Sequence, residues 1–303
     1  MTRVAGIDCG TNSIRLLIAD VERAGLTDVV REMRIVRLGQ GVDSTGRLAP
    51  EALERTRAAL ADYAATIREH VAVRVRMVAT SATRDAANRD EFTAMVQAEL
   101  GVVPEVITGQ QEAALTYNGA ASALEDAKGS LLVVDIGGGS TELVRGTDGT
   151  IRAHSMDVGC VRMTERHLRD DPPTAEQIEA TVADVRAATE DARTDVPLDG
   201  PLTFVGVAGT VTTVAAIALG LDRYDADVIH GSTMSAAEIA EVTDRLLRMT
   251  HAERAALPVM HPGRVDVIGG GALVLRTLVE ETGVSSIVAS EHDILDGIAL
   301  SLG

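Results

Sequence analysis

The segment at residues 131–143, LLVVDIGGGSTEL, constrains the fold of this chain more than any other stretch. Its apolar run is typical of a buried strand, which ends at Asp135 just before three glycines. Glycine lets the backbone approach an anion closely, and successive N–H groups in such a turn can bind phosphate. We therefore predict a phosphate-binding loop, against the alternative of a tight turn without a ligand. The predicted phosphate contacts are Gly137, Gly138, Gly139, Ser140 and Thr141.

Two carboxylates flank this glycine turn. Asp135 ends the predicted strand, and Glu142 follows the turn. Carboxylates in this position can share one Mg²⁺ ion, or the second can orient a metal-bound water. We therefore predict Asp135 and Glu142 as metal ligands for Mg²⁺, with Mn²⁺ as the alternative ion.

The same pattern occurs near the start of the chain. Residues 4–20 read VAGIDCGTNSIRLLIAD and residues 132–145 read LVVDIGGGSTELVR, so each has a strand, an aspartate, a glycine-bearing turn and a second strand. This repeat predicts a duplicated domain whose two loops face each other across a cleft; two unrelated hairpins are the alternative. The predicted phosphate contacts in the first copy are Asp8, Gly10, Thr11, Asn12, Ser13 and Arg15.

A hydrolase must also activate water, and Glu112 is the candidate general base. Thr108 and Gln111 have the spacing of a helix capping box, which predicts a helix start there and places Glu112 in the first turn. A glutamate at that position also complements the helix dipole, which is the competing interpretation.

Two further segments carry phosphate-binding chemistry. Arg84 lies in the polar segment TSATRDAAN after a predicted strand, where its guanidinium can clamp a phosphate. The turn at residues 206–210, GVAGT, precedes a predicted helix, so its N–H groups favour an anion. Gly209 and Thr210 are the predicted contacts there.

Composition narrows the function classes. The formal net charge of −17 argues against a nonspecific nucleic-acid binder, although a polyanionic substrate masked by metal ions stays compatible with it. Cys9 and Cys160 form neither a disulfide framework nor a zinc pattern. No signal peptide and no apolar run of membrane-spanning length is evident, so we expect a cytoplasmic protein without a membrane or nucleic-acid partner.

The hydrophobic patterns predict alternating strands and helices, with a small, polar linker at 120–130. The predicted strands are 3–9, 14–20, 29–38, 73–79, 103–107, 131–135, 141–145, 151–157, 202–207 and 287–289. The predicted helices are 50–70, one ending at 100, 108–119, 174–193, 211–219, 235–248, 251–257, 262–281 and 291–301.

The motifs together resemble one known family, the exopolyphosphatase / guanosine pentaphosphate phosphohydrolase (Ppx/GppA phosphatase) family. The segments that carry the resemblance are DCGTNSIRLL, ATSATRDAAN, TGQQEA, DIGGGSTEL, GVAGT and VIHGS, in this order along the chain. The resemblance implies an α/β, duplicated, actin-like ATPase fold of the sugar kinase/Hsp70/actin and ribonuclease H-like type, with mixed five-stranded sheets flanked by helices. It implies domains at 1–119, joined by a returning helix at 290–303, and at 120–289, with the active site in the cleft between them.

The resemblance also implies residue roles. The family's catalytic glutamate falls on Glu112, and its metal-binding acids fall on Asp135 and Glu142. Gln111 stands where the family usually has an acid, and Thr11 stands where serine is commoner. Long relatives carry an additional C-terminal helical domain, and we expect this chain to be a short form without it. A homodimer is expected from the resemblance alone.

The expected function is Mg²⁺-dependent release of terminal orthophosphate from inorganic polyphosphate, favouring short chains. One alternative keeps the chemistry and changes the substrate to pppGpp. Another alternative keeps the fold without phosphate hydrolysis. The protein would then be a nucleotide-dependent kinase or a noncatalytic alarmone or phosphate sensor.

Overall fold

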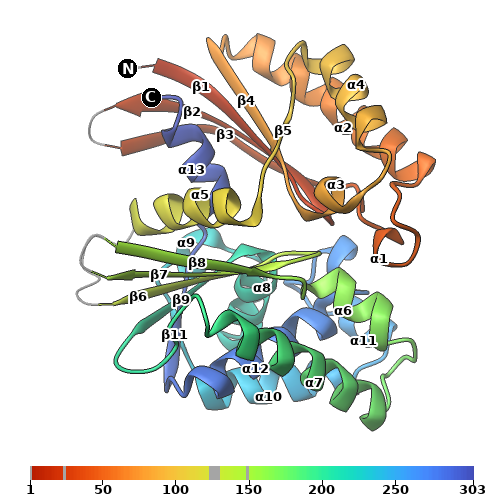
Figure 1. Ribbon diagram of the computed structural model, residues 1–303, viewed down its shortest axis with the longest axis vertical. Coiled ribbons are helices and arrows are strands. Elements are labelled where there is room, and N and C mark those ends of the chain that lie inside the picture. The colour runs from red at the N-terminus through yellow and green to blue at the C-terminus, as the bar shows by residue number, and fades with distance from the viewer. Residues whose placement is uncertain (1, 23–24, 123–129, 148–149) are drawn as a thin grey trace. The chain divides into compact units, whose positions relative to one another are not determined.

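The computed structural model describes residues 2–22, 25–122, 130–147 and 150–303. Contacts divide the chain into two compact units (Figure 1). Unit 1 comprises Met1–Ala123 and His292–Gly303, and unit 2 comprises Leu124–Glu291. The sequence prediction placed the boundaries after 119 and 289. Most of the predicted linker, residues 123–129, lies outside the described residues, and the active-site cleft stays a prediction.

Unit 1 contains a five-stranded mixed sheet in the order β3-β2-β1-β4-β5. The first three strands are antiparallel neighbours, whereas β4 and β5 continue the sheet parallel to β1. The strands are β1 (Thr2–Cys9), β2 (Ser13–Glu22), β3 (Gly25–Ile35), β4 (Arg74–Ala79) and β5 (Glu105–Val106).

Helices cover both faces of this sheet (Figure 1). They are α1 (Val42–Thr45), α2 (Pro50–Glu69), α3 (Ser81–Asp85), α4 (Arg89–Leu100), α5 (Gly109–Ser122) and α13 (Ile294–Leu300). Successive residues of a strand point to opposite faces. In β1, Ala5 and Ile7 therefore pack into the core beneath α2 and α4, whereas Gly6 lies against Ile298 of α13. Asp8, two residues after Gly6, is on the α13 face.

Unit 2 contains a six-stranded sheet in the order β10-β11-β9-β6-β7-β8. Its strands are β6 (Leu131–Ile136), β7 (Thr141–Thr147), β8 (Thr150–Met156), β9 (Thr203–Val207), β10 (Thr233–Ser235) and β11 (Ser286–Ala289). The expectation of five strands was wrong for this unit, because the three-residue strand β10 adds an antiparallel edge to β11. A strand of three residues has too little periodicity to be seen in a sequence.

The helices of unit 2 gather mainly on one face of the sheet (Figure 1). They are α6 (Cys160–His167), α7 (Ala175–Ala192), α8 (Ala208–Ala218), α9 (Ala226–Ile229), α10 (Ala236–Arg248), α11 (His251–Ala255), the 3₁₀ turn η1 (Pro262–Arg264) and α12 (Ile268–Thr282). The α8 and α12 helices contact the central strands of the sheet, and α7 and α10 pack on α12 and contact the edge strands β8 and β10. Their hydrophobic core includes Leu132, Val134 and Phe204 from the strands.

The two sheets share one topology, which confirms the predicted duplicated α/β fold. In each sheet, the first three strands form an antiparallel meander, and the next strands pair in parallel on the opposite side of the first strand. Strands β1, β2, β3, β4 and β5 of unit 1 therefore correspond to β6, β7, β8, β9 and β11 of unit 2. The helices that follow the last parallel strands, α5 and α13, also correspond. They pack against each other within unit 1.

Several predicted boundaries shift in the structure. The predicted helix 262–281 begins only at Ile268, because Pro262 starts a separate 3₁₀ turn. The final helix begins at Ile294 rather than 291, because Asp293 is its N-cap in a capping box. The short helices α1, α3, α6 and α9 were not predicted, since none is longer than eight residues.

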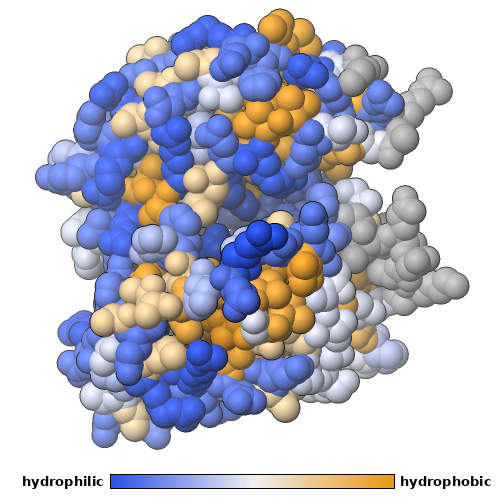
Figure 2. Space-filling model, turned by 180° about the vertical axis from the view of Figure 1, so that it is seen from behind, coloured by the Kyte–Doolittle hydropathy of each residue, from blue (hydrophilic) through white to orange (hydrophobic). Residues whose placement is uncertain are grey.

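The surface carries no single dominant apolar region on the face seen in Figure 2, where hydrophobic patches alternate with hydrophilic side chains. Among the residues that the structure describes, the large exposed hydrophobic ones are Val71, Val73, Val103, Ile151, Leu219, Tyr224 and Val228. The homodimer therefore stays a prediction. None of the helices in the described part of the chain has the length and hydrophobicity needed to span a bilayer.

Candidate active site

The glycine loop of unit 2, residues 137–140, which we call the second loop, joins β6 to β7. It is closed by a hydrogen bond from the Gly137 amide to the Ser140 carbonyl (3.1 Å). Within the described residues, the amides of Gly138, Gly139 and Ser140 have no hydrogen-bond acceptor. Three consecutive N–H donors are therefore available to an anion, whereas the amide of Gly137, a predicted contact, closes the loop. Phosphate binding by this loop stays a prediction.

The carbonyl groups of the second loop are held by the unpredicted helix α6. The amides of Cys160 and Val161 donate to the carbonyls of Gly137 and Gly138, both at 2.9 Å. Gly159 precedes the helix, and a Cβ there would lie 2.5 Å from the Gly138 carbonyl oxygen. This contact requires glycine and binds the loop rigidly to unit 2. Helix α6 thus orients the carbonyls inward, away from any bound anion.

Asp135 and Glu142 are directly opposite each other on β6 and β7. Both are buried, with exposed fractions of 6% and 1%. Glu142 Oε1 also accepts a hydrogen bond from Ser155 Oγ of β8 (2.7 Å). Like charges in directly opposite positions destabilise a sheet unless another charge offsets them.

A divalent cation fits this acidic pair. Mg²⁺ typically binds through one or two carboxylates and completes its coordination with water and substrate phosphate. Among the described residues there is no group of three or more His, Cys, Asp or Glu side chains that could hold a metal. Two carboxylates suit an ion whose remaining ligands are water and substrate phosphate.

The first loop, residues 10–13, repeats this construction in unit 1. The Gly10 amide donates to the Ser13 carbonyl (2.9 Å), matching the bond that closes the second loop. Thr11 Oγ1 is hydrogen-bonded to Ser81 Oγ (2.9 Å), which ties the loop to the start of α3. The Asn12 carbonyl accepts two amides from the segment after β3.

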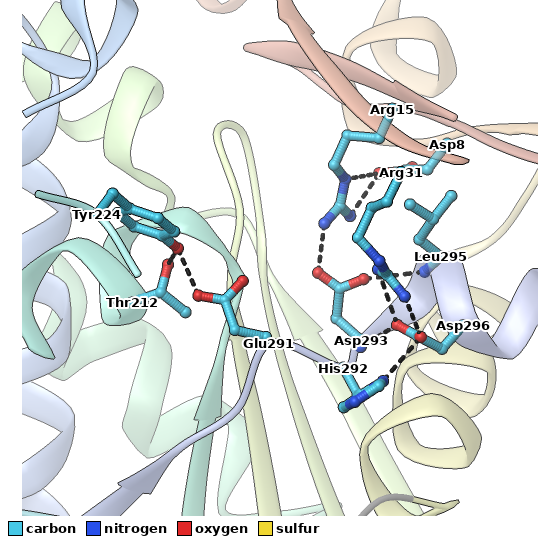
Figure 3. Close-up of polar contacts among 10 residues, drawn as sticks. All are labelled: Asp8, Arg15, Arg31, Thr212, Tyr224, Glu291, His292, Asp293, Leu295 and Asp296. Atoms are coloured by element: carbon cyan, nitrogen blue, oxygen red, sulfur yellow. Dashed lines mark hydrogen bonds and ion pairs between the residues drawn. The ribbon is translucent and has the colours of Figure 1, made fainter. Parts of the chain in front are cut away.

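Asp8 lies opposite Arg15 in the first copy, where the second copy has two acids. Arg15 Nε and Nη2 donate to Asp8 Oδ2 at 3.0 and 2.6 Å, and Arg15 Nη1 donates to Asp293 Oδ2 (Figure 3). Burial raises the pKa of Asp8, and the Arg15 guanidinium opposes that rise. No sequence spacing pointed to Asp293, because it lies in the C-terminal segment His292–Gly303, which packs in unit 1 after the whole of unit 2.

Glu112 and Arg84 form an ion pair in unit 1. Glu112 is in the first turn of α5 and is 7% exposed. Arg84 Nη1 donates to Glu112 Oε2 and to the Ile107 carbonyl, both at 3.0 Å. The Nε and Nη2 groups of Arg84 have no acceptor among the described residues, so they are available to a phosphate. The predicted capping box is present, since Thr108 and Gln111 exchange amide hydrogen bonds at 2.9 and 3.2 Å.

The third turn, residues 206–210, lies beside the second loop, because β9 and β6 are adjacent and parallel. Ala208 has φ 68°, a left-handed conformation that is strained for a residue with a side chain. The Arg264 guanidinium lies over Gly209, where a Cβ would come within 2.1 Å of Nη2. Its Nη1 donates to Thr213 Oγ1 (2.9 Å). Sequence reasoning missed Arg264, which adds positive charge beside Thr210 and is far from it in the sequence.

A polar cluster extends from α8 to the boundary of unit 2 (Figure 3). The Tyr224 hydroxyl donates to Glu291 Oε1 (2.5 Å) and lies 2.7 Å from Thr212 Oγ1. The Glu291 amide donates to His230 Nδ1 (3.3 Å). These contacts give His230 a structural role and anchor the last residue of unit 2.

Within each unit the predicted residues converge on one sheet edge. In unit 1, β1 and β4 are parallel neighbours, which brings the first loop next to the segment that carries Arg84. In unit 2, β6 and β9 bring the second loop and the third turn together. These are the carboxyl ends of parallel strands, where α/β sheets commonly bind ligands.

Comparisons with known proteins show the family to which the chain belongs. The sequence matches the Ppx/GppA phosphatase family over residues 17–302. It is 55% identical to Exopolyphosphatase 2 of Mycobacterium tuberculosis, across 100% of this chain and 99% of that protein. The crystal structure of an exopolyphosphatase-like protein has a TM-score of 0.97 at 49% identity and covers 100% of this chain and 98% of its own. The Ppx/GppA family member of Aquifex aeolicus has a TM-score of 0.83 at 33% identity, with coverages of 99% and 97%.

Proposed function

Because the chain belongs to the Ppx/GppA phosphatase family, we propose that it is an exopolyphosphatase that releases terminal orthophosphate from inorganic polyphosphate, favouring short chains. The family consists of hydrolases that act on phosphoanhydride bonds. The observation that carries the proposal is the second loop, which offers three consecutive amide donors beside the acidic pair Asp135 and Glu142. Donors for phosphate and carboxylates for a cation suit a polyanionic substrate better than a neutral one.

Each unit contributes different chemistry in this proposal. The amides of the second loop and of the third turn bind phosphate oxygens, as do the free N–H groups of Arg84. Glu112 accepts the proton of the attacking water, and its contact with Arg84 orients the Glu112 carboxylate. The first loop, from Gly10 to Ser13, binds a further phosphate of the chain.

Mg²⁺ fits the Asp135–Glu142 pair, and these two residues would hold it. When bound, the ion neutralises negative charge on the phosphate being transferred. We also propose a cytoplasmic location and a homodimer.

Magnesium binding is expected to stabilise the protein through the acidic pair. At Mg²⁺ concentrations ten times the dissociation constant, the free energy of unfolding should rise by about 1.4 kcal/mol. The E142Q variant should lose this increase, because glutamine removes one of the two opposed charges. Thermal unfolding with and without Mg²⁺ measures the effect. Asp20→Asn is the matched control, since Asp20 is a buried strand acid paired with Arg3. An equal Mg²⁺ shift in E142Q and in the wild type would exclude the pair as the site.

A substrate panel tests the proposed activity directly. Phosphate release should be measured with short polyphosphate, long polyphosphate, pppGpp and ATP. We expect the highest kcat/KM with short polyphosphate. A preference for pppGpp would support the alternative substrate, and binding of alarmones without phosphate release would support a sensor and contradict the proposed enzyme.

A further inference from the structure

Asp8, Arg15 and Asp293 form a charge chain in unit 1, in which both acids are buried and Arg15 is partly exposed (Figure 3). Asp8 is at the end of β1 and Arg15 is opposite it on β2, on either side of the first loop. Asp293 comes from the segment that returns to unit 1 and is 2% exposed. One guanidinium therefore joins the base of the first loop to the start of α13.

Comparison of the two copies shows that this chain is specific to unit 1. Arg15 occupies the position that Glu142 occupies in unit 2, since each is opposite the aspartate at the end of the first strand. The first copy therefore contains its own cation, whereas the second has two opposed acids. In unit 1 the positive charge next to the first loop belongs to Arg15. The position of the Arg15 guanidinium depends on its second partner, Asp293.

The contacts of Arg15 determine how Asp8 is oriented. Both N–H groups that face Asp8 donate to Oδ2. Oδ1 is buried and has no hydrogen-bond partner among the described residues. A buried acceptor without a hydrogen-bond partner is uncommon, because leaving it unpaired costs free energy. Other contacts must offset this cost and hold the carboxylate in its orientation. The third N–H contact of Arg15, to Asp293, provides that restraint.

Asp293 is itself held firmly. Its Oδ1 accepts the Leu295 amide (3.0 Å) as the N-cap of α13, while Oδ2 accepts from Arg15. Its backbone carbonyl is packed against Gly119 of α5, where a Cβ would lie 1.8 Å from the carbonyl oxygen. The two carboxylate oxygens of Asp293 thus have separate partners, one in the helix and one at the loop.

We infer that Asp293 is a positioning residue that acts through Arg15 to orient Asp8 and the first loop for substrate phosphate. This inference rests on the proposed function, in which the first loop binds phosphate. It assigns Arg15 to the support of the loop, whereas the sequence pattern suggested a direct phosphate contact. Asparagine at position 293 tests the idea cleanly, because asparagine caps helices as well as aspartate does but presents an N–H donor or a neutral oxygen to Arg15.

The chain contains a matched control in Asp296. Asp296 is also buried at the start of α13, belongs to the same capping box and accepts from an arginine of the sheet, Arg31 (2.5 Å). It has no contact with Arg15 or with the first loop. A purely structural role for these acids predicts similar effects of D293N and D296N.

Steady-state kinetics with short polyphosphate separates the two roles. We expect D293N to raise KM on the order of tenfold with kcat within about twofold, because the loop binds substrate and transition state alike. D296N should leave both constants within about twofold. In an R15K background, D293N should add little, because one ammonium group does not bridge two carboxylates as a guanidinium does. An unchanged or lower KM in D293N would overturn the inference; a lower KM would mean that Arg15, once released, binds phosphate itself.

Amide hydrogen exchange gives a readout independent of activity. Exchange in residues 9–13 should accelerate at least about fivefold in D293N and stay near the wild-type rate in D296N. Equal exchange in both variants would overturn the positioning role. If the wild type releases phosphate from no substrate in the panel, the proposed function fails, while the exchange result still decides the role of Asp293.

Discussion

Replacing Glu112 with glutamine is expected to lower kcat for phosphate release by about 10²- to 10⁴-fold, the range found when a general base is lost. Glutamine has the same shape but does not accept the proton of the attacking water. Arg84 would keep its contact with the Ile107 carbonyl, so the local structure should persist. Single-turnover phosphate release, with circular dichroism as the folding check, measures the change.

Glu105→Gln provides the control for this prediction. Glu105 is also paired with an arginine, Arg76 (2.7 Å), but it is exposed and lies on β5. The kcat of E105Q should stay within about twofold of the wild type. Wild-type kcat in a folded E112Q protein would show that Glu112 is not the base.

Replacing Gly297 with alanine is expected to destabilise unit 1 by about 3 kcal/mol, at the upper end of overpacking effects. A Cβ at this position would lie 2.0 Å from the Leu115 carbonyl oxygen of α5, and a backbone atom has no side-chain freedom with which to move aside. The α5 and α13 helices would have to separate. Urea unfolding followed by circular dichroism gives the free energy of unfolding.

Gly269→Ala is the matched comparison, because it is another glycine to alanine change within a helix. Its Cβ would lie 3.5 Å from Leu247, which is ordinary van der Waals contact. Alanine there should stabilise the protein by about 0.5–1 kcal/mol through its higher helix propensity. If G297A lowers the free energy of unfolding by less than about 1 kcal/mol, α5 and α13 are not in close backbone contact at Gly297.

Much of the fold was predictable because its signals are local. The repeated strand, aspartate and glycine turn showed the duplication, and the apolar runs around each aspartate located β1, β2 and β6. The capping pair Thr108 and Gln111 located the start of α5. Each signal lies within about ten residues, where side chain and backbone interact regardless of the rest of the fold.

The supporting contacts of the site were not predictable in this way. Helix α6, whose amides hold the second loop, is short and is preceded by a glycine without a capping side chain. Arg264 and Asp293 reach their partners only after the chain has folded, so no spacing connects Arg264 with Gly209 or Asp293 with Arg15. A sequence shows which residues can bind a phosphate more readily than which residues hold them in place.

The position of α13 determines the order in which the two units can be completed during synthesis. Leu295 and Ala299 of α13 share a core with Val4, Leu17 and Ala19 of the first two strands. The ribosome must therefore make all of unit 2 before unit 1 receives its last helix, and until then this apolar face of the nascent sheet stays uncovered. Domains usually fold in N-terminal order as they emerge. Here the unit that starts first receives its last helix only after the other unit has been made.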